Sequence, residues 1–558
     1  PWDAMSQVVA LSSDPEIAAA SNDLLGVLAS ASGRAWVSGP DVAGPAIRLS
    51  VDPSAPNIET IRLEGNGDGI SIVGASPTAV AHGIYELCEK LGARWYFKSS
   101  IFNVMPVSLP VLSAVDEAHT PAVKYRRIWA PNTVGEQLET GAWARRNRLK
   151  SAESWFIRHT YDDIINPADA TVDPAVFCPS PTDRQQLDPF NQTVRDRATA
   201  FARNWLTTVS RNGSPSRVAP VSPNDGRGWC WDDDFDAAAL QYTTDAVAGL
   251  ALAVRDQLRI THPDKYTGYY CYSTYAGVPS QADLSGLHVD VATAFDVTAL
   301  NDEQRIKGLL LKGASVGMYE YISPWAGFED IHNGKTLIEV NEYRNYVTWG
   351  ATAYTGEGSD SWGVYGLLYW LLGKLFWEPG ANVDALLQDF YQNAFGPAAP
   401  QVEAYYARWL RGDPVNNRTL DLSVGDLDAA SAAVPAGSIE AQRIDWLKTH
   451  VYYMFKWRLH KANALTLAEY KAFFTFIYRI RDWYVVYHKG YVESKIRQKL
   501  IALGVTAAEI TALSNAAPYS TAEVEGLMVE VRAALVGTPV DAVTIPYDPQ
   551  ALIPAQFA

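Results

Sequence analysis

Three carboxylates directly follow segments that resemble β-strands. Asp225 lies in a Ser-Pro-Asn-Asp-Gly turn, and Glu320 and Glu357 stand near the ends of two apolar runs. An enzyme that hydrolyses a glycosidic bond usually needs two such groups, one as acid and one as base or nucleophile. The residue types therefore fit glycoside hydrolysis, and we expect Glu320 and Glu357 to be the catalytic pair, with Asp225 in reserve.

Each of these carboxylates also has an ordinary structural explanation. Asn-Asp-Gly is a common turn, in which the Asp225 side chain bonds its own backbone. Glu320 lies between two tyrosines, where burial could raise its pKa toward that of a general acid, but where it could equally pair with a buried arginine. Glu357 is flanked by glycines and could be a solvated loop residue.

Side chains near the same strand ends are candidates for holding a sugar. Aromatic rings with a polar tip suit the apolar C–H faces and hydroxyl rims of sugars, and the chain has 18 tryptophans and 29 tyrosines. Strand side chains alternate between faces, so only one of Arg126 and Arg127 can point into the interior. Tryptophans in loops after strands are expected to line the cleft rather than the core, and these are Trp229, Trp231, Trp325 and Trp362. The candidate substrate-binding residues are Arg127, Asn147, His159, Asn224, Trp229, Tyr272, Tyr319 and Trp362.

Composition argues against several other functions. With 46 Lys and Arg against 62 Asp and Glu, the net charge of −16 disfavours a nucleic acid or an anionic membrane as partner. Apolar runs fall short of the roughly 18 to 20 residues that cross a bilayer, so we expect no membrane insertion. No metal-ligand spacing and no phosphate-binding glycine loop occurs in the central region, so we expect no metal and no cofactor. Four scattered cysteines permit at most two disulfides and specify none; they are Cys88, Cys178, Cys230 and Cys271.

The order of the segments indicates three domains in an α/β chain. Residues 1–121 carry short apolar runs with helices between them, as in a small α/β accessory domain. In residues 122–378, strand-like runs alternate with amphipathic helices, which is typical of a (β/α)8 TIM-like barrel. Residues 379–558 are helical throughout, with an aromatic stripe that we expect to be interhelical core. Seven of the eight strands are expected at 124–130, 154–159, 217–222, 266–275, 289–295, 315–321 and 349–355, and the eighth within 164–189.

Several motifs resemble those of a known bacterial family. The runs at 79–87 and 91–97 resemble the N-terminal domain that precedes the barrel in family 67 α-glucuronidases and family 20 hexosaminidases. The chain is similar to the family filed as domain of unknown function 4838, which includes the family 163 endo-β-N-acetylglucosaminidases, in the motifs Ser-Pro-Asn-Asp-Gly at 222–226, Tyr-Glu-Tyr at 319–321, Gly-Glu at 356–357 and Leu-Phe-Trp-Glu-Pro at 375–379.

This resemblance implies a bacterial glycosidase, secreted or periplasmic, that acts on an oligosaccharide or polysaccharide, with an N-acetylhexosaminide as one candidate substrate. None of the three candidate carboxylates belongs to an adjacent Asp-Glu pair of the kind with which family 20 enzymes perform substrate-assisted hydrolysis. Residues 1–7 lack a signal-peptide pattern, so we expect that any export signal has been removed or never existed.

Three other functions stay open at this point. An α-glucuronidase-like enzyme would bind a uronate carboxylate with Arg126, Arg127 or an arginine of 145–148. A lyase acting on a uronic-acid polymer would need a base such as Tyr319 or His159. A non-catalytic carbohydrate-binding protein would keep the fold without a close pair of carboxylates.

The sharpest expectation concerns the two catalytic carboxylates. Because Glu320 and Glu357 lie just past strand ends on one rim, we expect them to face each other across one pocket, with Asp225 and Asn224 on its wall. A separation of roughly 5 to 5.5 Å would favour a retaining nucleophile, and roughly 6.5 to 9.5 Å an inverting base with room for water.

Overall fold

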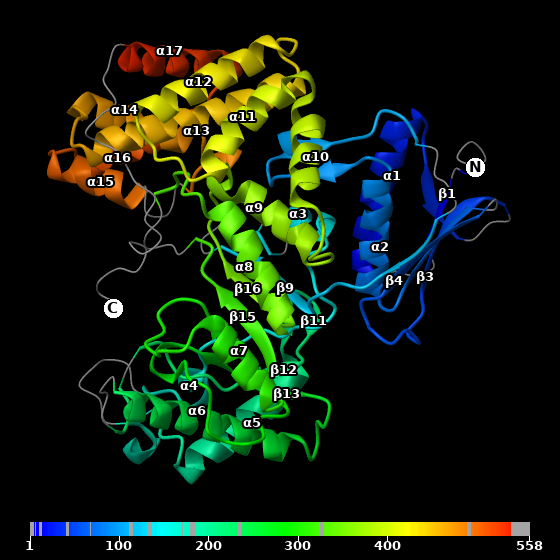
Figure 1. Ribbon diagram of the computed structural model, residues 1–558, viewed down its shortest axis with the longest axis vertical. Coiled ribbons are helices and arrows are strands. Elements are labelled where there is room, and N and C mark those ends of the chain that lie inside the picture. Colours follow the sequence, from blue (N-terminus) through cyan, green and yellow to red (C-terminus); the bar gives the residue numbers. More distant parts are fainter. Residues whose placement is uncertain are drawn as a thin grey trace.

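Three bodies of secondary structure follow one another along the chain in a computed structural model of the protein (Figure 1). An N-terminal sheet with two helices is followed by a curled parallel sheet with its own helices, and then by a group of C-terminal helices. The structure describes residues 5–536 except 6, 11–13, 41–43, 67–68, 111–114, 131–136, 140, 170, 179–185, 227, 232–235, 324–328 and 488–492.

The N-terminal sheet orders its strands as β2-β1-β3-β5-β4-β8. β1, β2, β3 and β5 run parallel, whereas β4 is antiparallel to both β5 and β8. α1 and α2 pack together on this sheet, and each begins at a side-chain cap, Asp14 and Ser76 respectively. The elements are β1 (Gln7–Ala10), α1 (Pro15–Ser32), β2 (Val37–Gly39), β3 (Ala46–Val51), β4 (Ile61–Asn66), β5 (Gly69–Gly74), α2 (Pro77–Lys90) and β8 (Asp116–His119), with a small hairpin of β6 (Arg94–Trp95) and β7 (Asn103–Val104).

The central sheet is wholly parallel, in the order β12-β13-β14-β15-β16-β9. Its first strand in the sequence, β9, pairs with its last, β16, so the sheet curls around an interior. Crossover helices lie between most successive strands, but β13 and β14 are joined by residues 272–286, which hold only the 3-10 turn Ser273–Tyr275. The strands are β9 (Tyr125–Trp129), β12 (Val218–Pro220), β13 (Tyr266–Cys271), β14 (Leu287–Ala292), β15 (Ser315–Glu320) and β16 (Ala353–Glu357), and the larger helices are α5 (Gln192–Thr208), α6 (Ala237–Leu258), α7 (Asp302–Leu311), α8 (Lys335–Trp349) and α9 (Trp362–Leu375).

Six of the seven placed strands are present, with shorter bounds than predicted. The seventh, 154–159, runs beside β12 but makes only an isolated parallel bridge, between Ser154 and Ser216. Within 164–189, where an eighth strand was expected, the described residues form a short 3-10 turn at Pro174–Val176 and an isolated antiparallel bridge. The structure therefore gives a mixed α/β architecture with a curled parallel sheet, while a complete eight-stranded barrel stays a prediction.

The C-terminal helices share one apolar core with the central sheet. That core runs from Tyr125 of β9 through Trp370 of α9 to Phe390 and Trp457 in the helical part. The predicted aromatic stripe is confirmed as interhelical core, because residues such as Tyr453 are fully buried. The helices are α10 (Val383–Phe395), α11 (Ala399–Leu410), α12 (Asn417–Ala432), α13 (Ile439–Lys461), α14 (Leu467–Arg479), α15 (Glu493–Ala502), α16 (Ala507–Ser514) and α17 (Thr521–Leu535).

One helix of the central part, α6, is long and apolar enough by composition to cross a membrane. Half of that apolar window is buried inside the protein, where α6 packs against α5 and β13. A core helix of a folded domain passes the same test, so α6 is explained by its packing.

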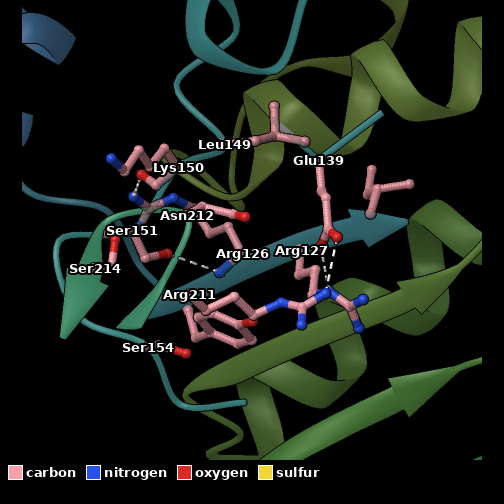
Figure 2. Close-up of a pocket in the computed structure, with 12 residues that line it drawn as sticks. Arg126, Arg127, Glu139, Leu149, Lys150, Ser151, Ser154, Arg211, Asn212 and Ser214 are labelled. Carbon is pink, nitrogen blue, oxygen red and sulfur yellow. Dashed lines mark hydrogen bonds and ion pairs between the residues drawn. The ribbon is translucent and has the colours of Figure 1, made fainter. Parts of the chain in front are cut away.

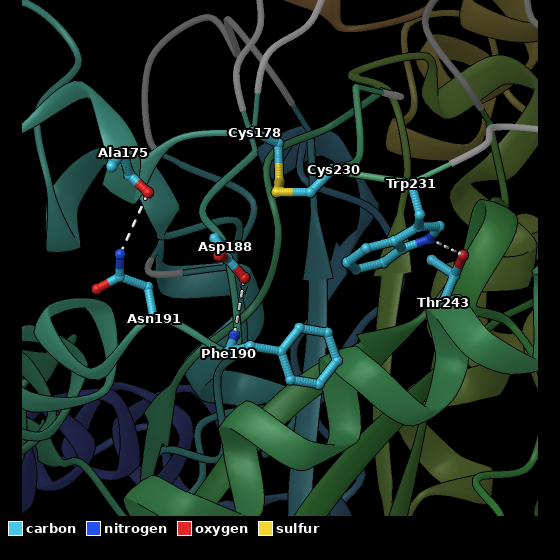
Figure 3. Close-up of a disulfide and its surroundings, with 8 residues drawn as sticks. All are labelled: Ala175, Cys178, Asp188, Phe190, Asn191, Cys230, Trp231 and Thr243. Carbon is cyan, nitrogen blue, oxygen red and sulfur yellow. Dashed lines mark hydrogen bonds between the residues drawn. A yellow bond between two sulfur atoms is a disulfide. The ribbon is translucent and has the colours of Figure 1, made fainter.

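A disulfide joins two loops of the central part (Figure 3). Cys178 bonds Cys230, which lies 52 residues away. The sequence could not specify this pairing; Cys88 and Cys271 are free and buried. Beside the bond, Trp231 donates from Nε1 to Thr243 Oγ1 at 2.9 Å, which ties the same loop to α6.

We expect the double variant Cys178→Ser/Cys230→Ser to lose about 2 to 4 kcal/mol of unfolding free energy, because the cross-link restricts the unfolded chain. Urea unfolding in the absence of reductant measures this loss. Reductant should destabilise the wild-type protein and leave the variant unchanged. Four accessible thiols in the unreduced, denatured wild type, instead of two, would contradict the pairing.

Candidate active site

The inner face of the curled sheet carries the polar residues of the candidate site. Tyr319 of β15 pairs in register with Thr355 of β16, so Tyr319 and Glu357 point to the same face. The Tyr319 hydroxyl accordingly donates to Glu357 Oε2 at 2.8 Å. Glu357 ends its strand at the carboxyl edge, which is where reacting groups lie in folds built from parallel strands.

Glu357 is the carboxylate of this face that stands out electrostatically. Its side chain is buried, with the residue only 6% exposed. Burial raises the pKa of Glu357, and Asp225 adds to that rise, while the hydrogen bond from Tyr319 and the charge of Arg127 oppose it. A carboxyl group with a raised pKa can hold a proton near neutral pH, as a general acid must.

Asp225 approaches the same region from the loop after β12. Its Oδ1 accepts from the Tyr272 hydroxyl at 3.0 Å. Gln186 holds the loop, since it accepts from the Asn224 amide at 3.1 Å and donates to the Asn224 carbonyl at 2.8 Å. Gly226 turns the chain with φ 111°, a backbone conformation that favours glycine.

Six rings form a closed series beside these two carboxylates, which bond two of its tyrosines, and we call this series the mouth ring. Each ring centroid lies 5.1 to 6.3 Å from those of its two neighbours in the series. Phe295 has φ 64°, a left-handed conformation that is rare for a bulky residue and that sets the direction of its ring. In order, the members are His159, Tyr270, Tyr319, Tyr321, Phe295 and Tyr272.

A third acidic side chain of the inner face, Asp290, lies below the mouth ring in the interior. His288 Nε2 lies 3.1 Å from Asp290 Oδ1, and both residues are buried. A Cβ atom at Gly317 would come within 2.1 Å of the same oxygen, so glycine makes the room for this carboxylate. The His288–Asp290 pair therefore lies in the buried interior beneath the site, and not among the residues of the mouth ring.

Glu320 lies on the opposite face of the sheet, and the expectation that it faces Glu357 is wrong. Successive strand residues point to opposite sides, so Glu320 turns away from the face that holds Tyr319. Its Oε1 accepts from Thr293 Oγ1 at 2.8 Å and its Oε2 from the Tyr346 hydroxyl of α8 at 2.9 Å. Glu357 and Asp225 are therefore the two carboxylates that contact the mouth ring.

The two arginines of β9 also separate as the alternation predicts (Figure 2). Arg127 faces inward, stacks on Trp129 and pairs through Nε with Glu139 at 2.5 Å. Arg126 faces outward and pairs with Glu59. Both guanidinium groups already hold a carboxylate of the protein.

Other predicted substrate-binding residues divide into two groups. His159, Tyr272 and Tyr319 are in the mouth ring, and Nδ1 of His159 bonds the Pro223 carbonyl. Asn224 borders Asp225, but its side chain bonds Asp162 at 2.7 Å.

The remaining predictions of substrate contact are corrected by burial. Asn147 donates to the backbone carbonyl of Trp95 at 2.9 Å, away from the mouth. Trp362 is 1% exposed and packs against Trp143, so no face of its ring is open to a sugar. Trp229 is buried beneath Trp231, which stacks on it at 5.3 Å and is itself half-buried. Trp325 lies outside the described residues.

Removing the Tyr319 hydroxyl tests the electrostatics of Glu357. That hydrogen bond lowers the pKa of Glu357, so Tyr319→Phe should raise the pKa further. The limb of the pH–rate profile that Glu357 controls should then move to higher pH, whether the protonated or the ionised form is active. Tyr270→Phe is the matched control, because the Tyr270 hydroxyl donates to the Ile157 carbonyl instead. A limb that moves in the control and not in Tyr319→Phe would contradict the assignment.

Comparison with known proteins adds a family and a fold. The model of a family described as "Domain of unknown function (DUF4838)" matches residues 97–407, more than half of the 558 residues. No curated protein matches the sequence significantly. A family GH115 4-O-methyl-α-glucuronidase with specificity for decorated arabinogalactans superposes with a TM-score of 0.54 at 11% identity, over 94% of this chain and 79% of that one.

Two further solved structures are similar at lower TM-scores. A family 89 glycoside hydrolase from Clostridium perfringens, in complex with PUGNAc, has a TM-score of 0.46 at 9% identity, over 96% of this chain and 79% of that one. A GH138 enzyme targeting pectin rhamnogalacturonan II has 0.36 at 10% identity, over 95% and 99%. At such identities the first likeness shows a fold shared with a glycoside hydrolase.

Proposed function

The chain belongs to the DUF4838 family, and on that premise we propose that it is a glycoside hydrolase whose catalytic carboxylates are Glu357 and Asp225. The observation that carries this proposal is that each carboxylate is hydrogen-bonded to a tyrosine of the same mouth ring, Glu357 to Tyr319 and Asp225 to Tyr272, at the carboxyl edge of a parallel sheet. A protein that only bound sugars would need the rings but not the pair of carboxylates.

The two carboxylates divide the reaction between them. Glu357, with its pKa raised by burial, donates its proton to the glycosidic oxygen as the bond from that oxygen to the anomeric carbon breaks. Asp225 acts from the other side of the sugar, either by removing a proton from the attacking water or by bonding the anomeric carbon before water displaces it. Tyr272 holds Asp225 in place through its hydroxyl.

The substrate we propose is a neutral or N-acetylated glycan. The mouth ring offers apolar faces with hydroxyl tips, which match the two kinds of surface on a sugar. Two of the arginines that could bind a uronate already pair with carboxylates of the protein, Arg127 with Glu139 and Arg148 with Glu86 and Glu89.

Three further features belong to this proposal. We take the curled sheet as the greater part of a (β/α)8 barrel in residues 122–378, between an accessory domain at 1–121 and a helical domain at 379–558. The Cys178–Cys230 disulfide favours a secreted or periplasmic location, because such bonds persist in oxidising compartments. The acid and base roles of two carboxylates require no cofactor for the chemical step.

A digestion screen over polysaccharides and protein-linked glycans, with mass spectrometry of the products, tests the proposal. We expect the wild-type protein to release sugars from at least one substrate, and the double variant Glu357→Gln/Asp225→Asn to release none. Binding without cleavage by the wild-type protein across the whole screen would favour a non-catalytic sugar-binding protein. Products that carry a new carbon–carbon double bond would indicate a lyase instead.

A further inference from the structure

A second group of acidic side chains lies behind the sheet, between β15 and α8, apart from the mouth. It consists of Glu320, Glu339 and Glu342, whose nearest carboxylate oxygens all lie within 4.8 Å of one another. Glu339 and Glu342 stand three residues apart on α8, so both project from the same side of that helix. Glu320 reaches them from the end of β15.

Two buried oxygens beside this group lack a hydrogen-bond partner among the residues that the structure describes. One is Glu339 Oε2, on a residue that is 2% exposed. The other is the hydroxyl of Tyr354, on a residue that is 1% exposed, and it lies close enough to interact electrostatically with all three carboxylates. A buried oxygen without a hydrogen bond costs folding free energy, so a bound ligand would stabilise each of these two.

The charges point to what that ligand is. Lys335 pairs with Glu339 at 3.1 Å, and with all three carboxylates ionised this one ammonium would leave two negative charges without a counter-charge in a buried space. A divalent cation would neutralise them. Carboxylates and a hydroxyl are hard oxygen ligands, and a site built mainly from protein oxygens suits Ca²⁺ better than Mg²⁺, which tends to keep its waters.

We propose that Glu320, Glu339 and Glu342, with the Tyr354 hydroxyl beside them, form a structural calcium site that joins α8 to the back of the curled sheet. Tyr321 of the mouth ring lies next to this site in the chain, and its amide donates to Glu320 Oε1 at 2.8 Å. Lys335 donates to the Tyr321 carbonyl at 3.4 Å. A cation here would hold the backbone of the Tyr319–Tyr321 segment from behind, with no part in the chemical step.

Calcium titration of the chelator-dialysed protein tests the site, with isothermal calorimetry and the thermal midpoint as readouts. We expect one Ca²⁺ per chain with a dissociation constant at or below about 10⁻⁴ M. Saturating Ca²⁺ should raise the thermal midpoint by about 2 °C or more, because the ion binds only the folded state. Mg²⁺ should bind more weakly; tighter binding of Mg²⁺ would overturn the choice of ion.

Variants show whether the ion binds at this group. Glu342→Gln removes a half-buried ligand and should fold, and it should weaken Ca²⁺ binding by at least about tenfold. Glu339→Gln should do the same. Glu303→Gln is the control, since Glu303 is an exposed residue of the neighbouring helix α7 and pairs with Lys307. Absence of Ca²⁺ binding to the wild type at millimolar concentration, or wild-type affinity in Glu342→Gln, would overturn the proposal.

Discussion

Replacing Glu357 with glutamine is expected to lower kcat by at least about 10²-fold, since general acid catalysis by one side chain contributes about 10² to 10⁴. Glutamine keeps the shape of the side chain and its place beside the Tyr319 hydroxyl, but it has no proton to transfer. Substrate binding should therefore survive, with KM within a few-fold of the wild-type value. Steady-state kinetics on the substrate found in the digestion screen measures both constants.

Three companion variants locate the effect. Asp225→Asn should be as damaging as Glu357→Gln. Asp163→Asn, an exposed change at a residue that pairs with Arg158, is its matched control and should retain turnover. Glu320→Gln should keep kcat within a few-fold, because its side chain points away from the mouth. A dead Glu320→Gln beside an active Glu357→Gln would reverse our choice of catalytic residue.

The second large effect is expected at the ion pair that joins the segment before β4 to β9. Glu59→Ala should cost about 3 to 5 kcal/mol of unfolding free energy, because it leaves a buried guanidinium without its counter-charge. The side chains of Arg126 and Glu59 are 0% and 4% exposed. Glu59 accepts from both terminal nitrogens of Arg126, at 2.6 and 2.9 Å, and from the Ala152 amide at 2.6 Å.

Urea unfolding followed by tryptophan fluorescence measures that loss. Glu64→Ala is the control, because Glu64 forms an exposed pair with Arg62 that should contribute less than about 1 kcal/mol. The double variant Glu59→Leu/Arg126→Met should lose less than Glu59→Ala, since it removes both charges. A loss below about 1 kcal/mol in Glu59→Ala would mean that the backbone carbonyls around Arg126 suffice for it.

Position along the chain predicted the strands well but could not say which face a residue occupies. Glu320 and Glu357 both end strands, and nothing in the two segments fixes how β15 and β16 are offset. The register that pairs Tyr319 with Thr355 turns Glu357 inward and Glu320 outward. The Tyr-Glu-Tyr motif held the missing signal, because alternation forces its two tyrosines to one side and the glutamate to the other.

Contacts between distant segments were hardest to predict. The mouth ring takes its members from several strand ends, and the sequence holds no signal for Tyr270, Tyr321 and Phe295, because which rings become neighbours depends on how separate strands pair. Trp362 follows β16 as expected, but α9 begins at this residue and carries it into the core. The acidic group of Glu320, Glu339 and Glu342 likewise matches no metal-binding motif, since strand and helix bring its members together.

The apolar core shared by the curled sheet and the C-terminal helices governs how the molecule melts. Trp370 of α9 packs against Phe390 of α10 within that core, so neither body has a complete interior of its own. The curled sheet and the C-terminal helices should therefore unfold cooperatively, as one calorimetric transition.

The N-terminal sheet buries a separate core, and its unfolding is coupled to that of the other two parts chiefly through ion pairs. Removal of these charges would then split one endotherm into two, and a fragment ended near residue 378 would expose the very surface that keeps the sheet folded.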